Sequence, residues 1–211
     1  MSKLNGIDRR AFLRRASTTA LTLPLIGLGV VELTSCASAS SGTTLSPSGG
    51  WKTTICAANE PGEPMIITGT IYAPDGRTPL EGINLFVYQT DATGVYSTKS
   101  GEDQRNTRIH GQMRSNAEGK YEFRTIKPGS YPGSRNPAHI HAYMSGPGYP
   151  EYWIDEFHFT DDPFISDEDK SKAAAKGNFS PILKLTRDSE GILRGVRNIT
   201  IERCSRNCTG R

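Results

Sequence analysis

The chain has 211 residues, with 25 Lys and Arg against 22 Asp and Glu, so its formal net charge is +3 at pH 7. The first 35 positions hold five of the basic residues and two of the acidic ones, which leaves 20 of each in the remainder. A neutral remainder argues against nucleic acid as a partner and against a polybasic membrane-binding patch.

The N-terminal segment has the pattern of an export signal. The stretch DRRAFLRR places Arg9 and Arg10 ahead of an apolar run, ALTLPLIGLGVVEL, as is typical of a twin-arginine (Tat) signal. That run is too short and too polar for a membrane span, and it leads into LTSC, where Cys36 holds the position of a lipidated cysteine. We therefore expect residues 1–35 to be a signal peptide. The mature protein is then periplasmic or at the cell surface, with the lipid as its membrane anchor. The alternative is an ordinary cleaved signal with an incidental cysteine.

The remainder is predicted to form a tether and one domain. Residues 36–50 are rich in Ser, Gly and Thr, a composition typical of a flexible tether, and residues 51–211 are long enough for one domain with its own core. Three cysteines remain, so a disulfide is expected in an exported chain. The favoured pair is Cys56 with Cys204, and the pairs Cys56–Cys208 and Cys204–Cys208 stay open.

Short runs of alternating apolar and polar residues, separated by Gly and Pro, follow one another along the domain. The alternation is clear where Phe157 and Phe159 bracket His158. Such a series predicts an all-β fold, a single β-sandwich domain. The expected strands cover residues 65–73, 83–90, 120–126, 138–146, 147–159, 180–187 and 192–202.

One short helical insertion is expected on this β scaffold. In the stretch SDEDKSKAAAKG, Ser166 is a typical N-cap residue, acidic residues fill the first turn, and Gly177 ends the segment. The insertion is too small to be a second domain.

Two of the four histidines, His139 and His141, are one residue apart. Because residues two apart on a strand face the same side, the two imidazoles are expected to project together while Ile140 turns into the core. Two imidazoles on one strand suit a metal ion. On this feature alone, a pair of ordinary surface histidines is an equal alternative.

Two tyrosines in turn-rich segments complete a candidate metal site. Tyr131 lies between the turns of KPGSYPG, and Tyr96 follows the turn in QTDATGVY. Phenolate oxygens are hard anionic donors, so together with imidazoles they favour a hard, highly charged cation such as Fe(III) over zinc. For each tyrosine alone, the alternative is a packing role in the core or rim of the sandwich.

The residues around these side chains form three blocks, GEPMIITGTIYAPDGRTPLEGINLFVYQTDATGVYST, NAEGKYEFRTIKPGSYPG and NPAHIHAYMSG. In order and spacing, the blocks resemble the intradiol ring-cleavage dioxygenases, the protocatechuate and catechol dioxygenase family. The resemblance implies a β-sandwich of the intradiol dioxygenase (prealbumin-like) type with non-haem Fe(III) as its cofactor. It also implies that the four metal ligands are Tyr96, Tyr131, His139 and His141.

An activity is implied as well. Enzymes of this family cleave a catechol-type aromatic diol with O2 between its two hydroxyl-bearing carbons, and both oxygen atoms enter a muconate-type diacid. Tyr131 matches the tyrosine that leaves the iron when the diol binds and then accepts a proton, which makes it a predicted catalytic residue. Formation of a homo-oligomer is the family habit.

Two positions depart from the family pattern. The arginine that family members carry three residues before the first histidine, where it stabilises negative charge on the ring, is Asn136 here. Its neighbour Arg135 is the candidate for that catalytic role. A tryptophan of the first block is replaced by Tyr88, which we interpret as a packing change. An altered substrate preference is the expected consequence.

Further side chains are candidates for the wall of the substrate pocket. Asn136 is one, His110 lies in the polar interval between the first two blocks, and Tyr149 and Trp153 follow the third block. By contrast, His158 alternates with two phenylalanines and is expected to face solvent.

The competing interpretation is a non-catalytic cell-surface β-sandwich that binds iron, catechols or another partner. Prealbumin-like binding and spacer modules share the GKYEF strand and the PGSY turn for structural reasons. They do not require His139 and His141 together with Tyr96, and for this reason the enzyme is preferred. A family relative that binds iron or catechols without turnover is the remaining alternative.

Overall fold

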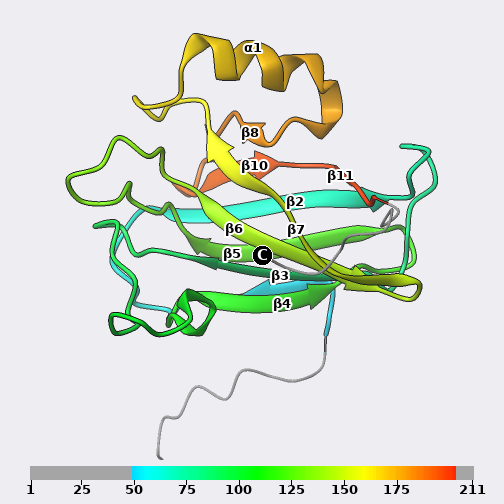
Figure 1. Ribbon diagram of the computed structural model, residues 1–211, viewed down its shortest axis with the longest axis horizontal. Coiled ribbons are helices and arrows are strands. Elements are labelled where there is room, and N and C mark those ends of the chain that lie inside the picture. The colour runs from blue at the N-terminus through cyan, green and yellow to red at the C-terminus, as the bar shows by residue number, and fades with distance from the viewer. Residues whose placement is uncertain (1–48, 203–211) are drawn as a thin grey trace, which may run out of the picture. The chain divides into compact units, whose positions relative to one another are not determined.

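The computed structural model describes residues 49–202 (Figure 1). The predicted signal peptide, Cys36, most of the predicted tether, Cys204 and Cys208 lie outside the described residues, and the predictions made for them stay predictions. Among residues 49–202, no helix is long and apolar enough to cross a membrane.

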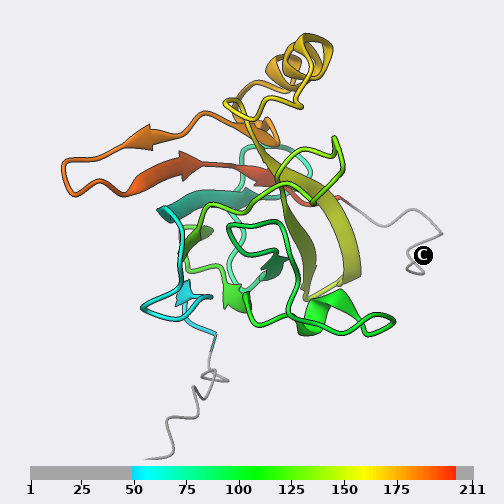
Figure 2. The same ribbon diagram turned by 90° about the vertical axis from the view of Figure 1, so that its left-hand side faces the viewer.

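Two β-sheets share one hydrophobic core, as the all-β sandwich prediction requires (Figures 1 and 2). The six-stranded sheet contains β1 (Lys52–Thr54), β2 (Pro64–Tyr72), β5 (Lys120–Ile126), β9 (Thr186–Arg187), β10 (Leu193–Val196) and β11 (Ile199–Thr200). The five-stranded sheet contains β3 (Asn84–Gln89), β4 (His110–Arg114), β6 (Ile140–Gly146), β7 (Tyr149–Phe159) and β8 (Ile182–Leu183).

The two sheets differ in how their strands pair. In the six-stranded sheet the order is β1-β5-β2-β10-β9, and β11 also pairs with β2. Strand β5 is antiparallel to β2. Strand β1 is parallel to β5, and β10 and β11 are parallel to β2. In the five-stranded sheet the order is β4-β3-β6-β7-β8, and its first four strands are antiparallel. Figure 2 shows the hairpin of β9 and β10 extending away from the rest of the molecule.

The core lies between the sheets because alternate residues of the long strands are apolar. Tyr121 and Phe123 of β5 are fully buried, and so are Val87 of β3 and Ile140 and Ala142 of β6. The intervening residues of β3 and β6 therefore point to the outer face of the five-stranded sheet. That outer face carries the candidate site.

The helical insertion forms as expected. Helix α1 (Asp167–Ala175) begins after Ser166, whose hydroxyl accepts a hydrogen bond from the Asp169 amide at 3.1 Å. Ala173 is the buried residue of the helix. Two short 3-10 helices, η1 (Gln104–Asn106) and η2 (Gly177–Phe179), complete the described helical elements.

Cys56 follows β1, a three-residue strand that lies ahead of the first strand expected from the sequence. It pairs with no other cysteine among residues 49–202. The pair Cys56–Cys204 stays a prediction.

Candidate metal centre

The two histidines of the His-x-His motif meet on the outer face of the five-stranded sheet. His141 lies on β6 opposite Tyr88 of β3, and His139 comes one residue before the strand begins. Both side chains are buried, and their Nε2 atoms are 3.2 Å apart. The alternation of the strand thus brings the two imidazoles together while Ile140 packs in the core.

Two loops bring the tyrosines to the same place. The turn after β3 carries Tyr96, and the turn after β5 carries Tyr131. These turns touch backbone to backbone, because Gly129 donates a hydrogen bond to Asp91 at 2.9 Å and a Cβ atom at Gly94 would collide with the carbonyl of Ser130. Gly94 also has φ +82°, a conformation that glycine adopts readily. The close approach of the loops leaves the two phenol oxygens 3.0 Å apart.

The four predicted ligands meet around the Tyr131 hydroxyl. The Tyr131 hydroxyl lies 3.0 Å from Nε2 of His139 and 3.3 Å from Nε2 of His141, in addition to its contact with Tyr96. An ion whose bonds are roughly 2.0–2.2 Å long holds ligand atoms at right angles about 3 Å apart. These separations fit a single metal ion with two phenol oxygens and two imidazole nitrogens.

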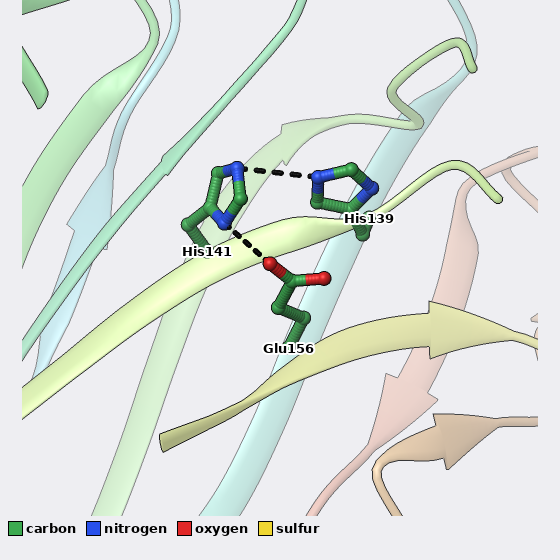
Figure 3. A group of neighbouring side chains, drawn as sticks. All are labelled: His139, His141 and Glu156. Carbon is green, nitrogen blue, oxygen red and sulfur yellow. Dashed lines mark hydrogen bonds and ion pairs between the residues drawn. The ribbon is translucent and has the colours of Figure 1, made fainter. Parts of the chain in front are cut away.

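The opposite ring nitrogens indicate how the histidines are protonated. Nδ1 of His139 lies 2.6 Å from the Pro137 carbonyl oxygen, and Nδ1 of His141 lies 2.7 Å from Oε1 of Glu156 (Figure 3). Both acceptors favour a proton on Nδ1, so both Nε2 atoms present lone pairs to each other. Such a pair of facing acceptors is stabilised by a cation between them, and the outer contacts are those typical of metal-bound histidines.

Glu156 reaches His141 because of an irregularity in β7. Ile140 pairs with Phe157 and Ala142 pairs with Ile154, so a β-bulge places two residues of β7 opposite His141. Bulges often re-aim a side chain beside an active site. The carboxylate contacts Nδ1, on the side of the ring away from Nε2, and the contact is bent relative to an ideal hydrogen bond. Glu156 therefore orients His141 and lies outside the set of four ligand atoms, although a carboxylate oxygen is within 4.8 Å of both histidines.

The protein surroundings favour the uncharged forms of Tyr96, Tyr131 and His139. Burial raises the pKa of Tyr96, and its hydrogen bond with Tyr131 raises this pKa further; burial likewise raises the pKa of Tyr131. Burial lowers the pKa of His139. Burial alone would raise the pKa of Glu156, but its contact with His141 and the nearby histidines outweigh burial and leave that pKa below its ordinary value. A cation must therefore displace the phenol protons to bind two tyrosinates.

Aromatic side chains cover His141. The Tyr88 ring stacks on the His141 imidazole with centroids 4.6 Å apart, and the Trp153 ring meets it edge-on at 4.8 Å. Tyr88 is thus a direct neighbour of the site, which is more than the packing change expected from the sequence. Trp153 keeps 42% of its surface exposed.

Asp162 is a buried residue that the sequence analysis missed. Its Oδ2 accepts hydrogen bonds from the Ala138 amide at 2.9 Å and from the Ser130 hydroxyl at 3.3 Å. Ser130 directly precedes Tyr131 in the chain, and Ala138 directly precedes His139. One carboxylate therefore ties together the two segments that supply these ligands, and only the tertiary structure makes this visible.

The remaining predicted residues lie at different distances from the centre. Arg135 is exposed, with its guanidinium 5.6 Å from the Phe164 ring centre, and its catalytic role stays a prediction. Tyr149 lies where β7 begins and packs partly against the core. His158 does not simply face solvent: its ring is 5.8 Å from that of His139, and its Nε2 is 3.6 Å from Glu156, so that expectation is wrong.

Two pockets flank the centre. One, of about 520 Å³, is lined by Asn136, Trp153, Glu156 and His158 together with residues of α1. The other, of about 250 Å³, contains His110 and Tyr143 in its wall. The first pocket touches direct neighbours of the ligand histidines. The second is separated from His141 by Tyr88, which stacks on both His141 and Tyr143.

Comparison with known proteins places the chain in a family. A family profile described as "Dioxygenase" matches residues 46–191. The chain is 30% identical over 116 residues to a protocatechuate 3,4-dioxygenase beta chain of Burkholderia cepacia, which covers 50% of this chain and 48% of that protein. It is 30% identical over 129 residues to catechol 1,2-dioxygenase 1 of Acinetobacter lwoffii, covering 52% and 40%. The match thus spans about half of the length of these relatives.

Solved structures show the same fold. The dioxygenase domain of a dioxygenase carbohydrate-binding fusion from Streptomyces sp. SirexAA-E superposes with a TM-score of 0.55 at 23% identity, covering 78% of this chain and 96% of that one. An intradiol ring-cleavage dioxygenase from Tetranychus urticae gives a TM-score of 0.57 at 20% identity, covering 80% and 95%. With its profile match over most of the folded region, the chain belongs to the intradiol ring-cleavage dioxygenase family.

Proposed function

We propose that this protein is a non-haem Fe(III)-dependent intradiol dioxygenase that cleaves a catechol-type aromatic diol with O2. The observation that carries the proposal is a cluster of four donor atoms, two phenol oxygens and two imidazole nitrogens, in which the Tyr131 oxygen lies 3.0 to 3.3 Å from the other three. Two anionic oxygens and two neutral nitrogens match a hard trivalent cation. The named activities of the relatives support the same reaction class.

Fe(III) at this site would act as a Lewis acid that binds both diol oxygens and makes the ring reactive toward O2. The chain supplies the orientation. His139 and His141 are buried and fixed through Nδ1 by Pro137 and Glu156, so they are expected to stay in place throughout.

Tyr131 is the ligand suited to leave. Its hydroxyl touches all three other ligands, yet it lies on a turn whose next residues, Pro132 and Gly133, are exposed. If the diol binds as a dianion, the Tyr131 oxygen would take one of its two protons and swing out as a neutral phenol, and the second proton would go to solvent. The centre would then exchange one tyrosinate for a dianionic diol, a change of one negative charge.

The overall reaction is balanced by the diol and O2 alone. The C–C bond between the two hydroxyl-bearing carbons breaks, and so does the O–O bond. Each cut carbon receives one oxygen atom from O2 and becomes a carboxyl group of a muconate-type diacid. The residues of the centre are unchanged at the end of the cycle.

The proposal includes a location outside the cytoplasm. It rests on Arg9, Arg10 and Cys36 in the leader, which are predicted to direct Tat export and lipid anchoring. Export by a route that carries folded proteins is compatible with loading of the metal before translocation.

The test is oxygen incorporation by the iron-loaded protein supplied with catechol and 18O2. One O2 is expected to disappear per diol, with two labelled atoms in the diacid, one in each carboxyl group. A product with the ring opened outside the diol, or an iron-loaded protein that takes up no O2, would contradict the proposal. A Tyr96→Phe variant, which lacks one ligand oxygen, is the matched inactive control.

A further inference from the structure

The buried carboxylate of Asp162, which follows the end of β7, accepts three hydrogen bonds. Its Oδ1 accepts from the Phe164 amide at 2.8 Å, within the turn that Asp162 begins. Its Oδ2 accepts from the Ala138 amide and from the Ser130 hydroxyl, which belong to two other segments of the chain. A buried carboxylate needs such donors, because it is costly to leave it without them. The turn thus fixes the carboxylate, and Oδ2 is the atom that acts on the metal centre.

The two contacts of Oδ2 differ in strength. The Ala138 amide belongs to the buried backbone that leads into β6, and its distance of 2.9 Å is that of an ordinary N–H···O bond. The Ser130 hydroxyl is on a half-buried side chain, and its distance of 3.3 Å is long for an O–H···O bond, which usually measures about 2.5–3.0 Å. Asp162 therefore holds the first segment firmly and the second one weakly.

This difference matches the roles of the adjacent ligands. His139 directly follows Ala138, and Tyr131 directly follows Ser130. In the proposed reaction the histidine stays on the metal, whereas the tyrosine leaves it. The firm contact is therefore next to the ligand that stays, and the weak contact is next to the ligand that leaves.

The turn that carries Tyr131 is anchored up to the residue before Ser130. The Gly129 amide donates to the Asp91 carbonyl at 2.9 Å, and the Gly129 carbonyl accepts from the Thr90 hydroxyl at 3.0 Å. Beyond Tyr131, residues 132–136 are exposed. The Ser130 hydroxyl thus makes the last side-chain contact ahead of Tyr131 that ties this turn to another segment.

We propose that the hydrogen bond from Ser130 to Asp162 is a latch on the release of Tyr131, and that Asp162 is a positioning residue that holds His139 while the latch opens. The inference rests on the proposed function, because it assumes that a diol displaces Tyr131 from the metal. A bond that is present only while the turn is closed lowers the population of the open turn, and it weakens diol binding by the same factor.

A pair of serine variants tests the latch. Ser130→Ala removes the hydroxyl that reaches Asp162, whereas Ser134→Ala removes a hydroxyl of the same turn that accepts from the Asn136 amide at 3.0 Å. The iron-loaded proteins are titrated with catechol in the absence of O2, and the midpoint of the change in visible absorption is measured. Ser130→Ala is expected to lower the midpoint concentration at least about threefold, the order expected for one hydrogen bond, and Ser134→Ala to leave it unchanged.

The outcomes separate the inference from the proposed function. A midpoint in Ser130→Ala that falls less than threefold, or rises, would overturn the latch while the exchange of Tyr131 still stands. An equal fall in Ser134→Ala would also overturn it, because the effect would then come from loosening of the turn in general. If catechol alters the spectrum of none of the proteins, the unmodified one included, the proposed exchange fails and the inference falls with it.

Asp162→Asn tests the other half of the assignment. An amide group has one oxygen, and its NH2 group cannot accept, so either the Ala138 amide or the Phe164 amide loses its acceptor. Metal titration against a competing chelator is expected to show at least about a fivefold loss of affinity in Asp162→Asn, the order expected when a buried donor is left unpaired, and no loss in Ser130→Ala. Unchanged affinity in Asp162→Asn, or an equal loss in both variants, would overturn the separate roles. The serine titrations remain decisive even if Asp162→Asn folds poorly.

Discussion

The carboxylate of Glu156 orients His141, so its charge and its oxygen atom can be tested separately. Glu156→Gln keeps an acceptor for the Nδ1 proton and removes the negative charge, while Glu156→Ala removes both. Outer partners of metal-bound histidines are worth about 10–100-fold in metal affinity. We expect Glu156→Ala to lose affinity in this range and Glu156→Gln to lose less, as measured by metal titration against a competing chelator.

Glu151→Gln is the matched control, because Glu151 is an exposed residue of the same strand that pairs with Arg105. Its metal affinity should equal that of the unmodified protein. If Glu156→Ala also bound the metal normally, the assigned contact with His141 would have no role in holding the ion.

At this scale the sequence singles out the four residues that the structure brings together, but it misses the residues that support them. Tyr96, Tyr131, His139 and His141 follow from the block resemblance, because each belongs to a short motif. Glu156 was missed because its orientation depends on a bulge that no local pattern announces. His158 was placed wrongly because alternation tells which face a residue takes, and not what covers that face.

The two tyrosine-bearing turns depend on the lack of a side chain at Gly94. Gly94→Ala forces a Cβ atom into the carbonyl of Ser130 and also strains a positive φ, a cost of about 1–3 kcal/mol for the backbone alone. We expect the variant to be less stable and to bind metal at least tenfold more weakly, because the two phenol oxygens are pushed apart. Chemical denaturation and metal titration measure the two effects.

Gly101→Ala is the control that strains the backbone in the same way but causes no steric collision. Gly101 has φ +87° in the same loop, and a Cβ atom there would meet nothing within 4 Å. The Gly101→Ala variant should therefore lower the free energy of unfolding through the strained φ angle alone, and it should leave metal binding intact. Equal loss of metal binding in both variants would show that contact between the turns is not what positions the tyrosines.

Among the elements, the long strands and the helix were predictable, and two short strands were not. β5 coincides with its prediction because Tyr121 and Phe123 alternate with charged residues, and α1 carries its own capping signal at Ser166. β1 is only three residues long and has no apolar residue to form a pattern. β4 presents only Gly111 and Met113 to the core, so its alternation is weak. Even so, β1 and β4 each form one edge of their sheet.

For the whole molecule, the centre joins segments that are far apart in the sequence. Its proposed ligands come from the turns after β3 and β5 and from the start of β6, so an ion held there would link three parts of the fold. Binding at 100 times its Kd stabilises the folded state by about 2.7 kcal/mol, which raises Tm by about 5–10 °C for a domain of this size. Thermal unfolding of the iron-loaded and chelator-stripped protein measures the difference.

Two histidine variants make that result specific. His141→Ala should show no change in Tm with iron, while His110→Ala, whose ring lies in the other pocket, should respond as the unmodified protein does. A metal-dependent rise in Tm that persists in His141→Ala would place the stabilising ion elsewhere.

The measurement that tests the central claim most directly is a visible absorption spectrum of the iron-loaded protein, titrated with catechol in the absence of O2. Tyr96 and Tyr131 bound to Fe(III) predict a tyrosinate-to-iron charge-transfer band that moves when the diol displaces Tyr131. In Tyr131→Phe the band should persist through Tyr96, and its change on adding catechol should be smaller. A protein that stays colourless with Fe(III), or a band that catechol leaves unaltered, would contradict a four-ligand centre with an exchangeable tyrosine.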